Sequence, residues 1–166
     1  MSGAFPAGRY LVRNTGSGLL LEVYGGVKGS GAVVQLGVEK GTAAQQWQID
    51  PVPNGGGLYH FVSVASGKRL DVAAASTENG ARIQQWRPNN FGAQEWIIER
   101  RLDAPGTVSI VSFISGLLLE TVDGSTDDGA RVQQWEDTDS PGQQWEDTDS
   151  PGQQWQFEPC PSGASG

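Results

Sequence analysis

The chain repeats itself three times with a period of 49 residues. In each repeat a leucine precedes an acidic residue, which places carboxylates at Glu22, Asp71 and Glu120. Other markers keep the same interval: Gly31, Gly80 and Gly129; Gln35, Gln84 and Gln133; Trp47, Trp96 and Trp145. No gap is needed to align them, so the sequence predicts three copies of one structural unit.

Short β-strands are predicted throughout these repeats. No window carries a sustained helical period, and glycine or Asn-Gly interrupts the apolar runs every eight to twelve residues. The twelve predicted strands, four per repeat, are residues 9–12, 18–23, 32–36, 45–49, 59–64, 69–73, 81–86, 94–98, 108–112, 116–122, 130–135 and 153–157. A 49-residue unit buries too little surface to fold alone, and closing a sheet removes its edges. We therefore expect one all-β barrel with threefold pseudosymmetry.

The third repeat contains a ten-residue duplication, QQWEDTDSPG at 133–142 and again at 143–152. Trp145 is followed by two acidic residues, whereas Trp155 is followed by Gln-Phe, which resembles the strand after the closing tryptophan of the other repeats. We predict that Trp155 closes the third repeat. Residues 136–152 then form a surface loop in which Trp145 is more exposed than Trp155, and Trp145 either folds back over the third repeat near Trp135 or marks a contact surface.

Composition excludes several classes of function. The formal net charge is −8, which argues against binding nucleic acid or an anionic membrane surface. The one cysteine, Cys160, and the one histidine, His60, leave no disulfide framework and no Cys- or His-rich metal centre. The acidic loops lack the pattern of a calcium-binding EF-hand, and no nucleophile–base pair or catalytic carboxylate pair stands out. We expect no enzyme activity, metal or cofactor.

The same reading predicts the domain organisation and the compartment. No apolar run is long enough to span a bilayer, so membrane insertion is not expected. The N-terminus lacks a signal-peptide pattern, which favours a cytoplasmic protein or one released without a classical signal. We expect one domain over residues 1–158, with repeats at about 8–56, 57–105 and 106–158, and a flexible tail at 159–166.

All six tryptophans lie in a Gln-x-Trp triplet, and each repeat also contains a leucine–carboxylate element. This set of motifs, over about residues 8–158, resembles the ricin B-chain-type lectins, the QxW β-trefoil family. The resemblance implies a β-trefoil, in which a six-stranded barrel is capped by three hairpins. It also implies binding of sugars, often galactose or N-acetylgalactosamine, with no catalysis in this domain.

The resemblance separates two kinds of tryptophan. It places the closing ones, Trp47, Trp96 and Trp155, in the core. It places the inner ones, Trp86 and Trp135, on the floor of a sugar pocket, 15 residues after the carboxylate. The chemistry fits, because an indole covers the C–H face of a pyranose, a carboxylate accepts hydroxyl protons, and amides both donate and accept.

The three predicted sites are unequal. The best site comprises Asp71, Gln84, Trp86, Asn89, Asn90 and Gln94. A second comprises Glu120, Gln133, Trp135 and Gln153. In the first repeat Gly37 replaces the aromatic residue, so no binding of the family type is expected there. The asparagine that the family usually has before the closing glutamine is absent from all three repeats, where Ala44, Ala93 and either Gly142 or Gly152 stand instead.

The favoured function is therefore a lectin for galactose- or N-acetylgalactosamine-type glycans and glycoproteins. Two alternatives stay open. One is a trefoil that binds or inhibits proteins and has degenerate sugar sites. The other is an accessory carbohydrate-binding module of a larger enzyme or toxin. With only one or two sites per chain, a homo-oligomer would gain avidity and could crosslink glycans.

Overall fold

The structure is a computed structural model that describes residues 5–102, 104–137 and 151–160. Within them lie twelve strands, as the sequence predicts. They are β1 (Gly8–Asn14), β2 (Leu20–Val23), β3 (Val34–Gly37), β4 (Trp47–Pro51), β5 (Leu58–Ser63), β6 (Arg69–Val72), β7 (Ile83–Trp86), β8 (Trp96–Arg100), β9 (Val108–Ser112), β10 (Leu118–Thr121), β11 (Val132–Trp135) and β12 (Trp155–Pro159).

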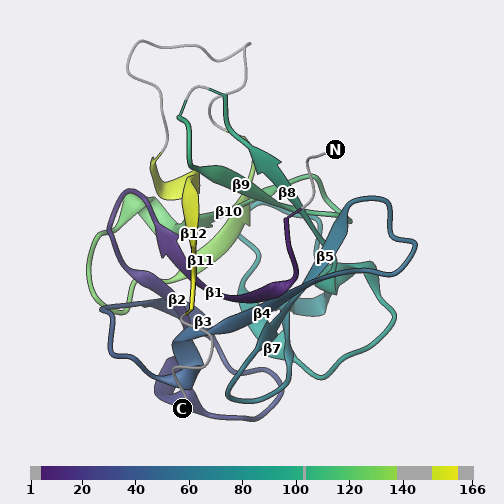
Figure 1. Ribbon diagram of the computed structural model, residues 1–166, viewed down its shortest axis with the longest axis horizontal. Helices are drawn as coiled ribbons and strands as arrows, with labels where there is room; N and C mark the ends of the chain where they lie inside the picture. The colour runs from purple at the N-terminus through teal and green to yellow at the C-terminus, as the bar shows by residue number, and fades with distance from the viewer. Residues whose placement is uncertain (1–4, 103, 138–150, 161–166) are drawn as a thin grey trace.

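Six of these strands close into a barrel (Figure 1). Antiparallel pairing runs from β1 to β4, β5, β8, β9 and β12, and β12 returns to β1. The remaining strands form three hairpins, β2–β3, β6–β7 and β10–β11. Because the hairpins recur at the predicted interval, the β-trefoil fold is confirmed.

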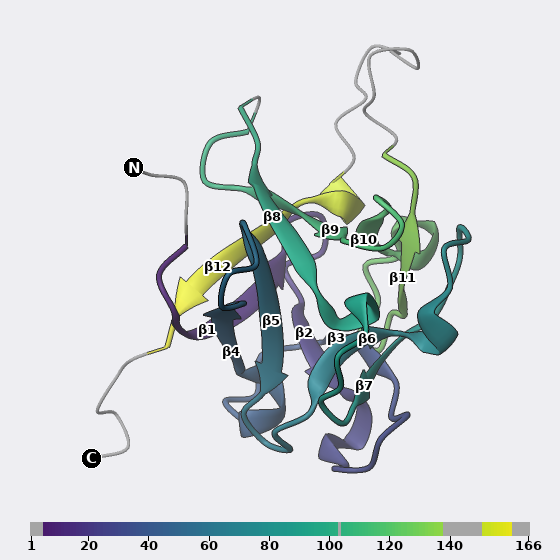
Figure 2. The same cartoon turned by 90° about the vertical axis from the view of Figure 1, so that its right-hand side faces the viewer.

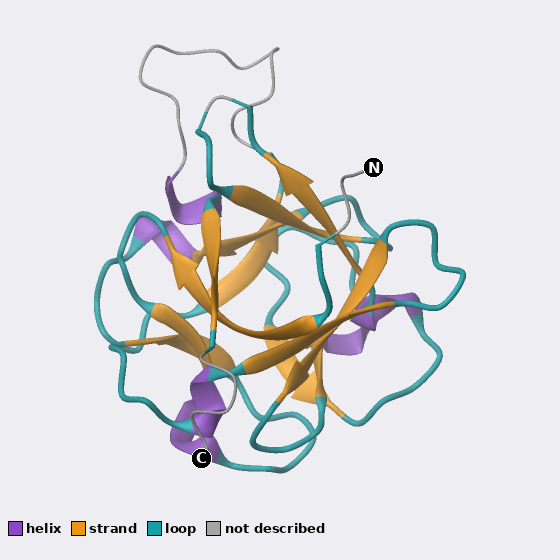
Figure 3. Cartoon of the chain, in the orientation of Figure 1, coloured by secondary structure: helices purple, strands orange, loops and turns teal. Residues whose placement is uncertain are grey.

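Short 3-10 turns lie around the outside of the strands (Figure 3). In the described part of the chain they are η1 (Tyr24–Gly26), η2 (Ala43–Gln45), η3 (Ala73–Ala75), η4 (Gly92–Gln94), η5 (Val122–Gly124) and η7 (Pro151–Gln153). The three predicted strands at 45–49, 94–98 and 153–157 begin later than expected because Gln45, Gln94 and Gln153 belong to η2, η4 and η7. No helix in the described residues is long and apolar enough to cross a membrane.

The core is built around the closing tryptophans. Trp47, Trp96 and Trp155 each have 0% of their surface exposed. Each indole N–H donates to the carbonyl of the leucine before its own repeat's carboxylate, at 3.0, 3.1 and 3.1 Å. The prediction that Trp155 closes the third repeat is confirmed, since its contacts match those of the other two. Trp145 and most of the predicted loop at 136–152 lie outside the described residues.

A second set of glutamines joins neighbouring repeats. The middle residues of the inner triplets, Gln85 and Gln134, are fully buried. The Gln85 amide donates to the carbonyls of Val27 and Gly29, and the Gln134 amide repeats this arrangement 49 residues later with Ser76 and Glu78. In the first repeat Leu36 takes this position and packs in the core instead. The Gln-Gln-Trp triplet therefore serves the fold through its second glutamine.

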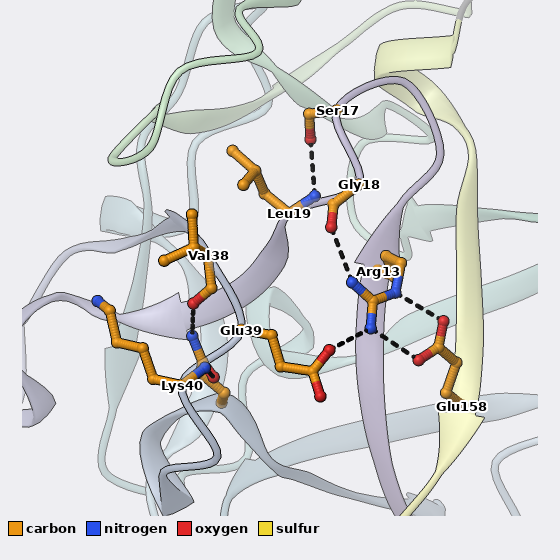
Figure 4. Close-up of polar contacts among 9 residues, drawn as sticks. Arg13, Ser17, Gly18, Leu19, Val38, Glu39, Lys40 and Glu158 are labelled. Carbon is orange, nitrogen blue, oxygen red and sulfur yellow. Dashed lines mark hydrogen bonds and ion pairs between the residues drawn. The ribbon is translucent and has the colours of Figure 1, made fainter.

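The first and last strands close the barrel side by side. Figure 2 shows β12 alongside β1, with which it is paired from Tyr10 to Asn14. Figure 4 shows the ion pairs at this seam: Arg13 contacts Glu158 at 2.7 Å and Glu39 at 2.7 Å. The hydrogen bond from Arg13 lowers the pKa of the Glu158 carboxyl. Beyond β12, the Cys160 N–H donates to the Arg9 carbonyl, and residues 161–166 of the predicted tail lie outside the described chain.

Candidate functional site

Each repeat holds its carboxylate between two glutamine amides. In the second repeat Gln84 Nε2 donates to one oxygen of Asp71 at 3.0 Å, and Gln94 Nε2 donates to the other at 3.1 Å. The pairing of β6 with β7 places Asp71 opposite Gln84, and η4 turns the Gln94 side chain back toward Asp71. The equivalent bonds recur at Glu22 and Glu120. We call this arrangement the carboxylate frame.

The second-repeat pocket lies beside Asp71 and has a volume of about 470 Å³. Asp71, Gln84 and the half-buried Trp86 line it together with residues that sequence analysis did not assign to it, Ala73, Ala74, Ala75, Arg82, Phe91 and Ala93. Phe91 is 68% exposed. The pocket thus combines a carboxylate, an amide and two aromatic rings, which is a suitable surface for a ligand with one apolar face and several hydroxyls.

The other predicted residues of this site take different positions. Asn89 lines the pocket, and its side-chain amide nitrogen makes no hydrogen bond with any described residue. Gln94 is fully buried; its amide nitrogen donates to Asp71 and to the Arg87 carbonyl, and its oxygen accepts from the Asn89 N–H. Gln94 therefore holds Asp71 and the loop in place rather than facing the pocket. Asn90 is exposed and does not line the pocket.

The third-repeat pocket has a volume of about 440 Å³ and brings together all four residues predicted for the second site, Glu120, Gln133, Trp135 and Gln153. Gln133 and Gln153 donate to the Glu120 carboxylate at 2.7 and 3.0 Å. Two of the residues that line this pocket, Asn14 and Gly16, come from the first repeat. They could not be predicted from the sequence, because they reach the third repeat only once β12 has paired with β1. Asp123 also lines it, at the position that Ala74 holds in the second repeat.

The first repeat has the frame but a different surface over it. A Cβ built on Gly37 would clash with the Glu22 carboxylate, so that carboxylate fills the space into which a side chain at 37 would extend. Lys40 Nζ lies 3.9 Å from the other Glu22 oxygen. With no aromatic ring at 37 and a lysine over the carboxylate, this repeat lacks the surface present in the other two.

Burial changes the acidity of the two pocket carboxyls. Desolvation raises the pKa of Asp71 above its ordinary value, against the opposing effect of the hydrogen bonds from Gln84 and Gln94. Desolvation also raises the pKa of Glu120, and the negative charge of Asp123 adds to the rise. Among residues 5–102, 104–137 and 151–160, no three His, Cys, Asp or Glu side chains gather in a way that could hold a metal ion.

The missed residues had a weak signal in the sequence. Ala74 and Asp123 occupy the same position of the repeat and adopt φ of 58° and 54°, a left-handed conformation that follows the carboxylate strand. Their 49-residue spacing was visible, but nothing in the sequence showed that the turn would fold toward the pocket. Arg82 lies two residues before Gln84 and hydrogen-bonds to it, which is a contact between alternate residues on one face of a strand.

The comparison with family models follows the same repeat. The model described as "Ricin-type beta-trefoil lectin domain-like" matches residues 4–86, 43–135 and 92–165. The chain belongs to this family. Its membership supports carbohydrate binding in general. The lectin-type fold is typical of non-catalytic carbohydrate binding, although such domains also occur within enzymes.

Solved structures agree with this assignment. The designed threefold symmetric protein ThreeFoil has a TM-score of 0.81 and 32% identity, over 92% of this chain and 99% of that one. The exo-β-1,3-galactanase 1,3Gal43A from Clostridium thermocellum also has a TM-score of 0.81, with 30% identity over 95% of this chain but only 31% of that one. The ricin B-like lectin of Macrolepiota procera, solved in complex with lactose, shares the fold with a TM-score of 0.73 and 19% identity, over 96% of this chain and 99% of that one. No curated protein sequence matches the chain.

Proposed function

We propose that residues 1–158 act as one lectin domain that binds galactose- or N-acetylgalactosamine-type glycans without catalysis. The main site is the second-repeat pocket, with Asp71 and Trp86 as its central residues. The third-repeat pocket, with Glu120 and Trp135, is a second site. The first repeat binds no sugar in this way.

One observation carries the proposal: Asp71 and Trp86 line the same pocket, and the carboxylate is held by two amides. A galactoside stacks its C–H face on the half-buried indole while its hydroxyls donate to the carboxylate. The frame orients both oxygens before the ligand arrives, so little ordering is needed on binding. Gln84 and Asn89 line the same pocket and supply amide groups to further hydroxyls.

The preference for galactose rests on shape and on the related lectin. The axial hydroxyl of galactose leaves one face of the ring open to an aromatic side chain. The Macrolepiota procera lectin, which has the same fold, was solved with lactose, a galactoside, and this makes lactose the first probe to use.

The proposal is tested by isothermal titration of the wild-type chain with lactose and, as a matched sugar, cellobiose, which lacks the axial hydroxyl. Lactose is expected to bind and cellobiose to bind much more weakly. Trp86→Ala is expected to abolish binding at the main site, and Trp135→Ala to remove the second. Phe113→Ala is a control, since Phe113 is 51% exposed and lines neither pocket. Retention of lactose binding in the Trp86→Ala, Trp135→Ala double variant contradicts the proposal, and failure of the wild type to bind any glycan favours a protein-binding trefoil.

A second candidate function is an accessory module that directs an enzyme or toxin to a polysaccharide. The galactanase match favours it, because this chain corresponds to only 31% of that protein. A module of this kind should be retained on an insoluble β-1,3-galactan, and Trp86→Ala should release it. Binding of lactose with no retention on the polymer favours a lectin for short glycans instead.

A further inference from the structure

The two pockets differ in charge although they share one frame. Three positions related by the 49-residue interval change between the second and third repeats: Arg69 becomes Leu118, Ala74 becomes Asp123, and Arg87 becomes Glu136. Each change makes the surroundings of the second-repeat pocket more positive or those of the third-repeat pocket more negative. The difference is therefore systematic around the pocket.

Arg82 is the cation that lines the second-repeat pocket. Its Nη2 donates to Gln84 Oε1 at 3.2 Å, which holds the guanidinium beside the Asp71 frame. The side chain is exposed, and no carboxylate of the described residues lies within ion-pair distance of it. A planar guanidinium with unused N–H groups at a pocket wall is suited to bind a carboxylate or sulfate.

Arg87 places a second cation beside the same pocket. Its guanidinium carbon lies 5.9 Å from the centroid of the Trp86 ring. The backbone there is fixed at both ends, because the Arg87 N–H donates to Ser30 Oγ and its carbonyl accepts from Gln94. Arg69 lies close by and donates to the Asn89 carbonyl at 3.1 Å. The pocket thus has one lining cation, Arg82, two further arginines in contact with its lining residues Trp86 and Asn89, and one acidic lining residue, Asp71.

The third-repeat pocket has the opposite balance. Glu120 and Asp123 both line it, and the negative charge of Asp123 contributes to the raised pKa of Glu120. Glu136 stands where Arg87 stands in the second repeat, with its N–H donating to Asn79 and its carbonyl accepting from Gln153. The third repeat does have Arg131 at the position of Arg82, but Arg131 does not line the pocket. An anionic ligand would meet two carboxylates here with no lining cation among the described residues.

We propose that the second-repeat pocket selects galactosides that carry an anionic group, a carboxylate or a sulfate, and that the third-repeat pocket selects neutral ones. The inference rests on the proposed function, since it concerns the ligand class of the same sites. Arg82 and Arg87 bind the anionic group beside the galactose that stacks on Trp86. Asp123 and Glu120 repel the same group in the third repeat.

The overall charge of −8 does not cancel this local effect. At about 0.1 M salt, charges further apart than about 10 Å are largely screened. The electrostatic potential at a bound ligand is therefore set mainly by the arginines beside the pocket. Raising the salt should weaken these local contacts as well, because Arg82 and Arg87 are exposed. The preference for an anionic galactoside is therefore expected to fall with ionic strength.

The test measures the ratio of two affinities, lactose 3′-sulfate over lactose, by titration calorimetry at 50 mM and 500 mM NaCl. Trp135→Ala isolates the second-repeat pocket, and Trp86→Ala isolates the third; Glu120→Gln replaces Trp135→Ala if that variant does not fold. In the isolated second pocket we expect the sulfated sugar to bind about three to ten times more tightly at low salt. In the isolated third pocket we expect it to bind more weakly than lactose. 3′-Sialyllactose as a further arm tells whether a carboxylate is accepted as well as a sulfate.

Variants assign the effect to the arginines. Arg82→Gln with Arg87→Gln should reduce the ratio in the second pocket to about one, whereas Arg131→Gln, the matched change in the third repeat, should leave it unchanged. A ratio of one or less in the isolated second pocket, or a ratio that the double variant does not alter, overturns the inference. Failure of both sugars to bind the wild-type chain overturns the proposed function, which is a distinguishable result.

Discussion

The first and second repeats have the same carboxylate frame and different surfaces above it. Glu22 and Asp71 are both 5% exposed, and each accepts hydrogen bonds from two glutamines. Yet the second repeat has an indole at Trp86, and the first has Gly37 with the Glu22 carboxylate in the vacated space. The frame is therefore part of the fold, and the pocket depends on a few residues placed above it.

This difference changes how the motifs should be interpreted. A buried carboxylate bonded to two amides is expected wherever a hairpin must satisfy its polar groups, with or without a ligand. The fold does not require the aromatic residue at the end of the second hairpin strand, because the first repeat forms the same hairpin with Gly37 at that position. The aromatic residues at this position, Trp86 and Trp135, therefore mark the two proposed sugar sites more directly than the Gln-x-Trp triplets do.

The largest expected effect separates the two kinds of tryptophan. Trp96→Ala should destabilise the domain by about 3–5 kcal/mol, because it empties a fully buried position and leaves the Leu70 carbonyl without its donor. Trp86→Ala should change the free energy of unfolding by less than about 1 kcal/mol, because the indole is only half-buried. Urea unfolding followed by circular dichroism measures both. Equal losses in the two variants would show that Trp86 belongs to the core.

A smaller effect tests whether Glu22 fills the first repeat. Gly37→Ala should cost about 1–3 kcal/mol, because its Cβ would lie on the Glu22 carboxylate, which must then leave its place between Gln35 and Gln45. Gly29→Ala in the same repeat is the matched control, since a Cβ there meets nothing within 4 Å. Thermal unfolding of the two variants gives the difference. A Gly37→Ala variant as stable as the control would mean that the carboxylate moves aside without cost.

The repeat made much of this arrangement predictable. A constant interval relates the carboxylates and the hairpin glutamines, so the barrel and the twelve strands followed from the pattern. The role of Trp155 followed from the Gln-Phe after it, because the interval alone leads to Trp145. The roles of Gln94 and Asn90 did not, because a triplet in the sequence does not reveal whether an amide faces a pocket or a carboxylate. Asn14 was missed because its contact with the third-repeat pocket depends on how β12 meets β1. Arg82 was missed because its spacing of two residues from Gln84 does not show that its side chain lines the pocket.

The raised pKa values of the two pocket carboxyls should affect ligand binding and protein stability in opposite directions. Since the pKa values of Asp71 and Glu120 are raised, both groups take up protons at a higher pH than ordinary carboxyls do. Lactose affinity should fall as the pH is lowered through this range, by up to about tenfold per pH unit, because protonation removes the charged acceptor. The same shift acts on stability with the opposite sign: the folded state binds these protons more tightly than the unfolded state, so this contribution favours folding as the pH falls.

Titration calorimetry and thermal unfolding from pH 7 to pH 4 would measure the two trends on one sample. The groups that face these carboxyls are the amides of Gln84 and Gln94 at Asp71, and those of Gln133 and Gln153, with the Asp123 carboxylate, at Glu120. An affinity that stays constant down to about pH 4, the ordinary range of carboxyl groups, would show that the charged form is not needed for binding.

The smallest expected effect concerns the duplication, which distinguishes the third repeat from the second. Removing residues 143–152 joins the inner triplet to a closing triplet ten residues later, the interval that separates Gln84 from Gln94. The shortened chain keeps residues 153–157, so Trp155 still fills its core position, and because both copies have the same sequence the residues that precede Gln153 are also unchanged. Halving a connection changes its closure free energy by only about 0.6 kcal/mol, so the shortened chain should fold with nearly unchanged stability. Its lactose affinity at the third-repeat pocket should also persist, since Gln153 and its bond to Glu120 are retained and Gly142 takes the place of Gly152 before it. Loss of more than about 2 kcal/mol in urea unfolding would mean that the duplicated segment is part of the core of the third repeat, and that the carboxylate frame there depends on residues absent from the other two repeats.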